Sequence, residues 1–339
     1  MTHEFKEIVQ NGLVAQKQGL KSVLATVVAL DGSSYRRPGV RMLIIENHEM
    51  VGAVSGGCVE KEILLRSQTV FKSGESKMMT YDGRYRLGCE GVLYILLELF
   101  QPEDIFEKAF FECIKKRQPF EIQSYYTKKE GVILGLGSFV KLNDEMFSLG
   151  NHSKEINKTL SIFNQTLSAC SKLVIIGAEH DAVQLCKYAA LTGWEVTIVA
   201  GAKEAKTIGD FQGASSFYAV TPEEINIESI DNQTAIVLMT HSFANDLRFL
   251  VALKETHPNY IGVLGPTKRR EDLLNQFLEY CPDIEDDFLE RIYGPAGIDI
   301  GSETPQEIAI SIMAEILAVT RKRDTISLSK KTGRIHSNL

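Results

Sequence analysis

L-V-I-I-G (173–177) and W-E-V-T-I-V-A (194–200) are the two runs that decide the fold of the C-terminal half of the chain. Each is a short apolar run of the kind that forms a buried strand, and a helical pattern at 181–192 separates them. The same alternation continues to residue 280, with strand-like runs at 217–220, 234–240 and 260–265 and helical patterns at 244–256 and 267–280. Strands that alternate with helices are typical of a doubly wound parallel sheet, so this half is predicted to be a Rossmann-like domain.

The turn after residues 173–177 matches the dinucleotide-binding fingerprint only in part. That fingerprint requires G-x-G-x-x-G after the first strand and an acidic residue at the end of the second. Gly177 supplies the first glycine, but Glu179 stands where the second glycine would let a pyrophosphate approach. The second strand ends in V-A-G (199–201), without the carboxylate that binds a ribose diol. The sequence therefore supports the fold but gives only weak support to NAD(P) as a cofactor.

Polar and glycine-rich segments follow several of the predicted strands. Ligands of parallel sheets bind beyond the carboxyl ends of the strands, so these segments are expected to line one crevice. The candidate ligand-binding residues in them are Gly177, His180, His241, Asp246, Arg269 and Asp299. A structural interpretation stays open beside the functional one, with Asp246 as a helix-capping acid and His241 as a hydrogen-bonding residue of the fold.

The N-terminal half is predicted to be a mixed α/β domain that ends near residue 150. Its helical patterns lie at 3–18, 58–72 and 102–117, its strand-like runs at 23–30, 41–45, 50–54, 76–81 and 91–99, and an antiparallel meander at 120–127, 131–142 and 145–149. The predicted organisation is a first domain at 1–150, a polar linker at 151–171, the Rossmann-like domain at 172–322 and a polar tail at 323–339. The last helix has a strong start signal, with Thr304 as N-cap, Pro305 in the first position and Glu307 in the third.

A second candidate site lies in residues 32–60, where arginines, paired glycines and a cysteine occur in one strand–loop–helix unit. The run M-V-G-A-V (50–54) leads to Gly56, Gly57 and Cys58, where an amphipathic helix begins. Paired glycines at a helix start let backbone N–H groups point at one anion, and the helix N-terminus stabilises a thiolate. The chemistry predicted is an anionic ligand beside a reactive thiol, with the ligand held by Gly56, Gly57, Arg36, Arg37 and Arg41.

Plain interpretations of these residues have to be weighed against that site. Cysteine is common as a small buried residue, a Gly-Gly pair can simply form a tight turn, and loop arginines are usually solvated. Each interpretation is adequate for one residue alone. The occurrence of all of them in one unit favours a site.

Composition limits the class of protein. The chain has 339 residues, 44% of them hydrophobic and 24% charged, and a formal net charge of −7, which argues against general binding to nucleic acid or to membrane surfaces. The apolar runs are shorter than a membrane span, and residues 1–7 lack the basic and apolar regions of a signal peptide, so neither a membrane span nor export is expected. The six cysteines (58, 89, 113, 170, 186 and 281) lack the spacing of a zinc site, so free thiols and a cytoplasmic location are expected.

The chain resembles the XdhC/CoxI family of maturation factors for molybdenum hydroxylases. The resemblance covers most of the chain through motifs in one order. They are G-S-S-Y-R-R-P-G-V-R-M (32–42), G-A-V-S-G-G-C-V-E (52–60), L-G-C-E-G-V (87–92), L-V-I-I-G-A-E-H (173–180), M-T-H-S-F-A-N-D (239–246), Y-I-G-V-L-G (260–265) and G-I-D-I-G-S-E-T-P-Q-E-I-A (297–309). The chain departs from the family pattern at Glu90, which follows Cys89 in place of a glycine, and at Glu179, which replaces the second glycine of the Rossmann turn.

The resemblance implies a function that fits the chemistry above. It implies a factor that binds molybdenum cofactor, supports its sulfuration with a cysteine desulfurase as sulfur source, and delivers it to an apo molybdenum hydroxylase of the xanthine dehydrogenase type. Cys58 would then be a thiolate ligand of molybdenum or a sulfur-handling group, and Cys89 a second thiol of the same site. A homodimer is also expected.

Two other functions stay open at this point. One is an NAD(P)-dependent oxidoreductase that uses His241 as acid or base, against which the incomplete fingerprint counts. The other is a purely structural adaptor, for which replacement of Cys58 by serine would be harmless. The maturation factor is the leading interpretation.

Overall fold

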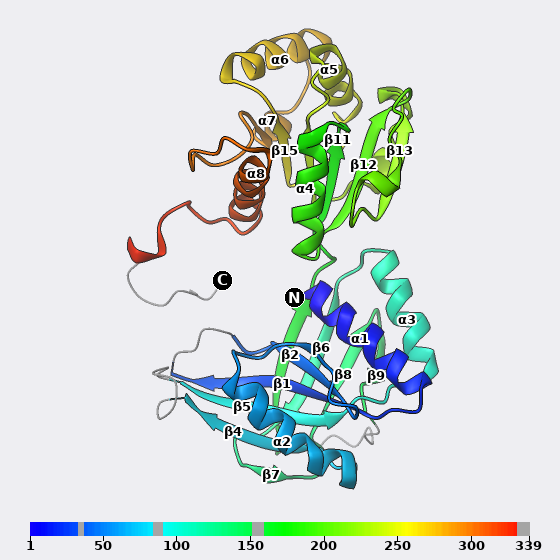
Figure 1. Cartoon of the computed structure of the whole chain (residues 1–339), viewed down its shortest axis with the longest axis vertical. Coiled ribbons are helices and arrows are strands. Elements are labelled where there is room, and N and C mark those ends of the chain that lie inside the picture. The colour runs from blue at the N-terminus through cyan, green and yellow to red at the C-terminus, as the bar shows by residue number, and fades with distance from the viewer. Residues whose placement is uncertain (33–36, 84–90, 151–158, 331–339) are drawn as a thin grey trace. The chain divides into compact units, whose positions relative to one another are not determined.

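The structure is a computed structural model that describes residues 1–32, 37–83, 91–150 and 159–330 (Figure 1). Arg36 and Cys89, both predicted site residues, lie outside the described residues. The chain divides into two compact units, residues 1–169 and 170–339. Within the described ranges, no helix has both the length and the apolar character needed to cross a membrane.

The first unit is built on an antiparallel six-stranded sheet, called the first sheet here. Its strand order is β3-β2-β1-β5-β4-β7, with β1 at Ser22–Asp31, β2 at Arg41–Ile45, β3 at Met50–Gly52, β4 at Lys77–Asp82, β5 at Val92–Leu99 and β7 at Gly131–Val132. Helix α2 (Cys58–Ser73) covers one face of this sheet and α1 (Thr2–Lys17) covers the other, while α3 (Asp104–Lys115) packs beside α1 and contacts β8 of the second sheet described next (Figure 1). Because side chains alternate between the faces of a strand, Met42 and Ile44 pack with α2, whereas Leu43 and Ile45 pack with α1.

A second, four-stranded sheet completes this unit. Its order is β10-β6-β8-β9, with β6 at Phe120–Tyr126, β8 at Gly137–Leu142, β9 at Glu145–Ser148 and β10 at Ser161–Leu167. The antiparallel pairing of β6, β8 and β9 confirms the predicted meander over 120–126, 137–142 and 145–148, but residues 131–132, predicted to belong to its middle segment, form β7 and pair with β4 in the first sheet. Residues 161–167, which the sequence analysis places in a polar linker, instead form β10 and pair with β6 along their full length. The strand forms there because it can bury Gln165 and Leu167 on one side while exposing Asn164 and Thr166 on the other.

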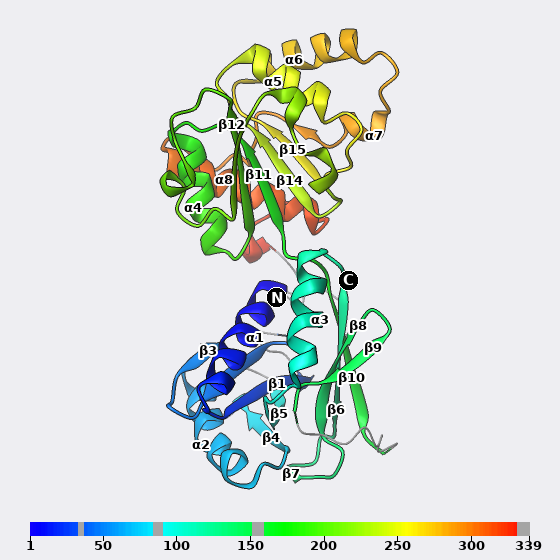
Figure 2. The ribbon, with the colours of Figure 1, turned by 90° about the vertical axis from the view of Figure 1, so that its right-hand side faces the viewer.

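The second unit is the predicted doubly wound parallel sheet. Its order is β13-β12-β11-β14-β15-β16, with β11 at Lys172–Ile176, β12 at Glu195–Gly201, β13 at Ser216–Val220, β14 at Thr234–Leu238, β15 at Tyr260–Val263 and β16 at Ile292–Tyr293. Every pair is parallel, and the order reverses between β11 and β14, which is the switch point of a Rossmann fold. The predicted fold class is therefore confirmed (Figure 2).

Helices cover both faces of this parallel sheet. One face carries α4 (His180–Leu191) and α8 (Pro305–Thr320), and the other carries α5 (Phe243–Ala252), α6 (Thr267–Tyr280) and α7 (Asp286–Leu289). Helix α8 begins as predicted, since the Thr304 hydroxyl accepts the Glu307 N–H and the Glu307 carboxylate accepts the Thr304 N–H. The crossover from β13 to β14 contains only two short 3₁₀ turns, η3 (Pro222–Glu224) and η4 (Ile227–Ser229), where a longer helix would cover more of the sheet.

Candidate functional site

The predicted glycine–cysteine site is a tight turn at the start of α2. Gly57 has φ 77° and ψ −64°, and the Cys58 N–H donates a hydrogen bond of 3.0 Å to the Gly56 carbonyl. These angles and this bond define a three-residue γ-turn of the hand that is strained for residues with a Cβ. Glycine at 57 is therefore required by the backbone.

The turn is open on its outer side. A Cβ added at Gly56 or at Gly57 would meet no atom within 4 Å, and the Cys58 thiol is exposed. The Cys58 N–H is used inside the turn. At the start of α2, the N–H groups of Val59 and Glu60 form no hydrogen bond to the described residues. The N–H groups of Gly56 and Gly57 also form no hydrogen bond to the described residues, and both glycines are exposed whereas Val59 is buried, so the cradle of glycine amides stays a prediction.

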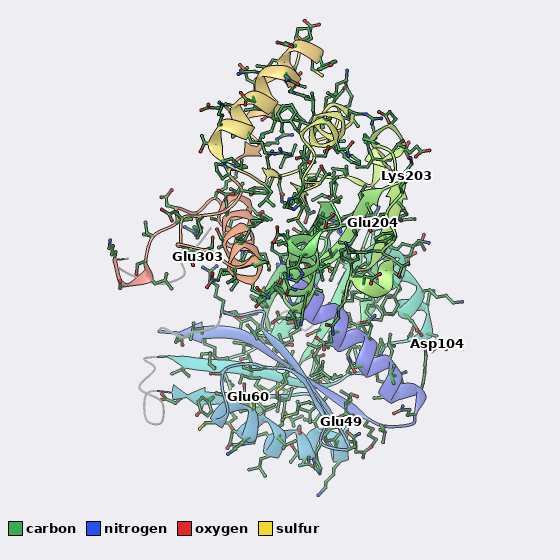
Figure 3. All side chains as sticks on the ribbon, turned by 45° about the horizontal axis from the view of Figure 1, so that its top comes forward. Glu49, Glu60, Asp104, Lys203, Glu204 and Glu303 are labelled. Atoms are coloured by element: carbon green, nitrogen blue, oxygen red, sulfur yellow. The ribbon has the colours of Figure 1, made fainter. Side chains whose placement is uncertain are left out.

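Glu60 fixes the chain that leads into this turn, and sequence reasoning missed it. One oxygen of its carboxylate accepts the backbone N–H groups of Val54, at 3.1 Å, and Ser55, at 2.7 Å. Figure 3 labels Glu60 on α2. The available signal was its position, because an acidic residue in the third position of a helix commonly bonds back to the preceding backbone.

The predicted arginines occupy different environments. Arg37 is exposed. Arg41 is only 6% exposed and lies over the Phe5 ring, 5.4 Å from its centroid. Its Nη1 donates to the Gly39 carbonyl at 2.9 Å and to the Gln165 side-chain oxygen. Burial lowers the pKa of Arg41 to about 10, although the Glu98 carboxylate acts in the opposite direction.

The structure does not bring Arg41 and Cys58 together. Arg41 alternates with Leu43 and Ile45 on the face of the first sheet that α1 covers, whereas Cys58 begins the helix that covers the opposite face. The contacts of Arg41 instead join β2 to α1 and β10. Of the two predicted arginines that the structure describes, Arg37 is the exposed one and Arg41 the buried one.

In the second unit, the switch point brings His241 next to the start of α4. His241 follows β14 with a left-handed φ of 55°, and its Nε2 lies 3.6 Å from the Asp181 carboxylate. His180, the exposed first residue of α4, precedes Asp181. Gly177 has φ 142°, and a Cβ there would lie 2.3 Å from the Met239 carbonyl oxygen, so the two loops can pack only with glycine at this position.

Asp246 positions the loop that carries His241 and is itself closed off from a ligand. Its side chain is 1% exposed, and one carboxylate oxygen accepts the Thr240 N–H at 3.2 Å and the Thr240 hydroxyl at 2.6 Å. The other oxygen accepts Arg269 Nη2 at 2.7 Å. Asp246 and Arg269 thus form an ion pair, and the hydrogen bonds of Asp246 to Thr240 fix the loop after β14.

The remaining rim residues carry charges of both signs. Glu179 occupies the N-cap position of α4 without a capping hydrogen bond from its side chain, and Lys206 Nζ, from the loop after β12, lies 4.0 Å from its carboxylate. Figure 3 labels Lys203 and Glu204 in the same loop. Asp299 bonds within its own glycine-rich loop, accepting the Gly301 N–H at 3.3 Å. The sequence analysis did not identify Asp181 and Lys206 as rim residues, because each is placed there by a contact with a residue of a different loop.

The two regions differ in the chemistry they offer. The turn at Cys58 presents an exposed thiol after two exposed glycines at a helix start, a combination that suits a soft metal or an anion. The rim of the second unit presents an imidazole beside a carboxylate, a combination that suits proton transfer. Among the described residues, no cluster of three His, Cys, Asp or Glu side chains has the geometry of a metal site.

Comparison with known proteins gives concordant matches in both units. Residues 15–82 match the model described as XdhC and CoxI family, and residues 173–316 match the XdhC Rossmann domain. A Bacillus subtilis protein, named as a probable subunit of xanthine dehydrogenase, is 29% identical over 321 residues, covering 89% of this chain and 94% of the relative. The Escherichia coli molybdenum cofactor insertion chaperone PaoD is 23% identical over 324 residues, covering 94% and 90%.

A solved structure shares the fold. It is the crystal structure of a Bacillus halodurans protein described as a xanthine dehydrogenase, with a TM-score of 0.76 and 23% identity. The match covers 94% of this chain and 97% of that one, so both units have counterparts there.

Proposed function

This chain belongs to the XdhC and CoxI family, and on that premise we propose that it binds molybdenum cofactor and delivers it to an apo molybdenum hydroxylase of the xanthine dehydrogenase type. Two relatives that align over most of this chain support the proposal, since one is named a cofactor insertion chaperone and the other a probable xanthine dehydrogenase subunit. The cofactor is cargo here and is passed on after binding.

One observation carries the assignment of the site: the exposed Cys58 thiol stands on an open turn at the start of α2, inside the segment that matches the family. A thiolate binds a thiophilic metal such as molybdenum. The exposed Gly56 and Gly57, whose N–H groups form no hydrogen bond to the described residues, are proposed to bind the phosphate of the cargo, with Arg37 as the cation from the same predicted segment, residues 32–60.

We extend the proposal to sulfuration of the cargo. Cys58 is exposed, as a thiol that receives sulfur from a cysteine desulfurase must be. Cys89 is proposed as a second thiol, and the working form of the protein is proposed to be a cytoplasmic homodimer.

The test compares cofactor binding by the purified chain and by Cys58→Ala. The variant should bind molybdenum cofactor at least about tenfold more weakly, since even outer-shell partners of a metal contribute ~10–100-fold. Cys281→Ala, which removes a buried thiol of the second unit, is the control and should bind normally. Activation of an apo-hydroxylase should be lost in step with binding.

Two outcomes would contradict the proposal. Unchanged cofactor binding by Cys58→Ala would remove that thiol from the site. Absence of cofactor binding together with saturable NADPH binding would replace the maturation factor by an oxidoreductase.

A further inference from the structure

A polar seam crosses the interior of the first unit, between the first sheet and the four-stranded sheet. Its members are buried polar side chains from both sheets: Thr26, Arg41, Glu98, Ser124, Ser138 and Gln165. Two contacts join the sheets across it, since the Glu98 carboxylate accepts the Ser138 N–H at 2.8 Å and Arg41 Nη1 donates to the Gln165 side-chain oxygen. The strands around the seam contribute apolar core, so its polar groups must find their partners within it.

Three side chains of this seam lie on one face of the first sheet. Arg41 stands opposite Thr26 in the pairing of β2 with β1. Glu98 stands opposite Leu24, two residues before Thr26, in the pairing of β1 with β5. Side chains directly opposite each other have Cβ atoms roughly 5 Å apart, and diagonal neighbours roughly 7–8 Å. Thr26 therefore lies on the strand between Arg41 and Glu98, and close to both.

The Arg41 guanidinium carries donors that the described residues do not use. Its Nη1 donates to Gly39 and Gln165, whereas Nε and Nη2 are buried and form no hydrogen bond within the described part of the chain. The Thr26 hydroxyl, in a side chain that is 0% exposed, likewise forms none there. Arg41 stays charged at neutral pH, because burial lowers its pKa only to about 10. Buried polar groups are satisfied by protein or by ordered water, so these groups call for a ligand.

The charges of the seam favour a neutral ligand over an anion. The Glu98 carboxylate acts to raise the pKa of Arg41, so a buried negative charge already opposes the positive charge of the guanidinium. An added anion would leave an unbalanced negative charge away from solvent, which is costly. Water is neutral, accepts a hydrogen bond from a guanidinium, and donates to hydroxyl or carboxylate oxygens, each of which can accept more than one hydrogen bond.

We propose that buried water joins Arg41, Thr26 and Glu98 and completes the polar contacts between the two sheets of the first unit. A buried water molecule needs roughly two to four polar partners. The donors of Arg41, the Thr26 hydroxyl and the Glu98 carboxylate together supply them. The inference does not rest on the proposed function, because these side chains lie on the face of the first sheet opposite to α2, which carries Cys58.

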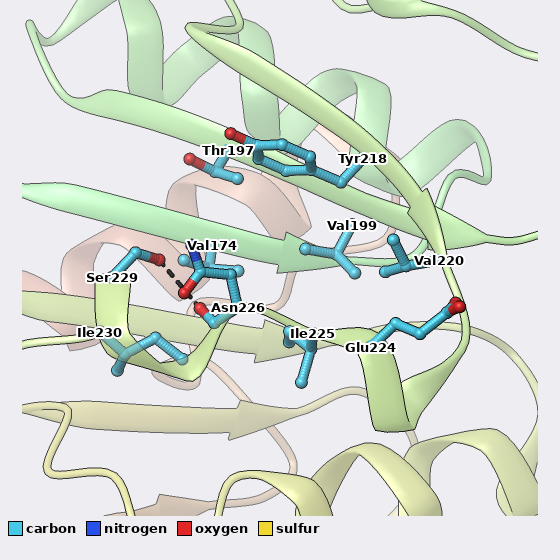
Figure 4. A pocket seen from close by; sticks show the side chains of 10 residues that line it. All are labelled: Val174, Thr197, Val199, Tyr218, Val220, Glu224, Ile225, Asn226, Ser229 and Ile230. Carbon is cyan, nitrogen blue, oxygen red and sulfur yellow. Dashed lines mark hydrogen bonds between the residues drawn. The ribbon is translucent and has the colours of Figure 1, made fainter.

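A cavity beneath the crossover from β13 to β14 provides the control. It has a volume of about 60 Å³, and Figure 4 shows Thr197 and Tyr218 along one side of it and Ile225 along the other. Tyr218 is 52% exposed, so water in this cavity exchanges readily with solvent. Thr197→Val and Thr26→Val are the same chemical change, made at an open cavity and in the closed seam.

Two measurements on the full chain test the inference. Oxygen-17 relaxation dispersion of the solvent counts the water molecules that stay inside a protein far longer than water stays on its surface. Thr26→Val keeps the size of the side chain but removes the hydroxyl, so this variant should lose at least one long-lived water, whereas Thr197→Val should lose none. A crystal structure of the natural chain should show a water oxygen within hydrogen-bonding distance of Thr26 Oγ1 and of Arg41 Nε or Nη2.

Three results would overturn the inference. One is an unchanged number of long-lived waters in Thr26→Val. Another is a crystal structure in which Arg41 Nε and Nη2 donate directly to protein acceptors, because the seam would then be complete without water. The third is an anomalous scattering peak beside Arg41 in crystals grown with bromide, which would identify a small anion as the ligand. The crystal structure needs no variant, so the test stands even if Thr26→Val fails to fold.

Discussion

Gly57 shows how one residue shapes the proposed site. Its backbone angles place the Cys58 N–H against the Gly56 carbonyl, directly before α2 begins. The neighbouring Gly56 does not have a positive φ, and a Cβ at either glycine would meet open space. Space is therefore not the reason for glycine at 57. The reason is backbone conformation, and the two positions form a matched pair for mutation.

Gly57→Ala is expected to destabilise the first unit by about 1–3 kcal/mol, the usual cost of a side chain in a sparsely populated backbone region. Gly56→Ala should have little effect. Urea unfolding of both variants measures the difference. Equal stability of the two would mean that the turn relaxes without cost. In the proposed function, Gly57→Ala should also weaken cofactor binding, because the turn presents the thiol.

At this scale the sequence predicts part of the site. The start of α2 at Cys58 follows from the Gly-Gly pair and the helical pattern. The position of Arg41 does not follow from its motif, which places it beside the other arginines. The alternation of residues 41–45 separates Arg41, Leu43 and Ile45 from Met42 and Ile44, but it does not say which helix covers which face. Which helix covers which face depends on how the helices pack against the sheet, and the sequence of the strand does not contain that information.

At the scale of elements, Glu315 ties α8 to the sheet and to a glycine-rich loop. One oxygen of its carboxylate accepts the Tyr260 hydroxyl at 2.6 Å and the Gly297 N–H at 2.8 Å. The Tyr260 ring stacks on Tyr293 with centroids 4.8 Å apart. Burial, and secondly the hydrogen bond to Glu315, raises the pKa of Tyr260 above its ordinary value.

This arrangement predicts a loss of stability at alkaline pH. Above about pH 10, the unfolded chain releases the Tyr260 proton whereas the folded chain keeps it, so the free energy of unfolding falls as pH rises. The slope for one such group is at most ~1.4 kcal/mol per pH unit. Urea unfolding at several pH values above 9 should show a shallower slope in Tyr260→Phe than in the natural chain.

The control for this prediction is Tyr280→Phe, since Tyr280 is 69% exposed on α6. That variant should keep the slope of the natural chain. If Tyr260→Phe and Tyr280→Phe gave the same slope, Tyr260 would not be the group that couples stability to alkaline pH.

At the scale of the whole molecule, the chain consists of two units that each have their own core. The pattern of strands and helices is enough to predict the class of both, because alternation fixes a parallel sheet and the meander fixes an antiparallel one. The crossover at 221–233 and the strand β10 are harder to predict. Their short polar segments gain structure from contacts with residues distant in the chain, such as Arg248 with Glu223.

Calorimetry of the full chain should therefore depart from a single two-state transition. Gly57→Ala should lower the midpoint of one transition by about 2–4 °C per kcal/mol, the usual response of a domain of this size. Tyr260→Phe should lower the midpoint of the other transition only. One cooperative transition that both variants shift together would show that the units unfold as one body.

The hydrogen bonds that close the first unit have a consequence for synthesis. The Thr2 hydroxyl bonds to the Ser168 carbonyl at 2.7 Å, across 166 residues, and Arg41 bonds to Gln165 of β10. The opening helix of the chain therefore lacks one of its partners until the ribosome has made the last strand of the unit. Since domains fold as units during translation, the first unit should mature only as the second begins to emerge. A nascent chain stalled before residue 161 should remain more sensitive to protease than one stalled after the whole first unit has left the ribosome.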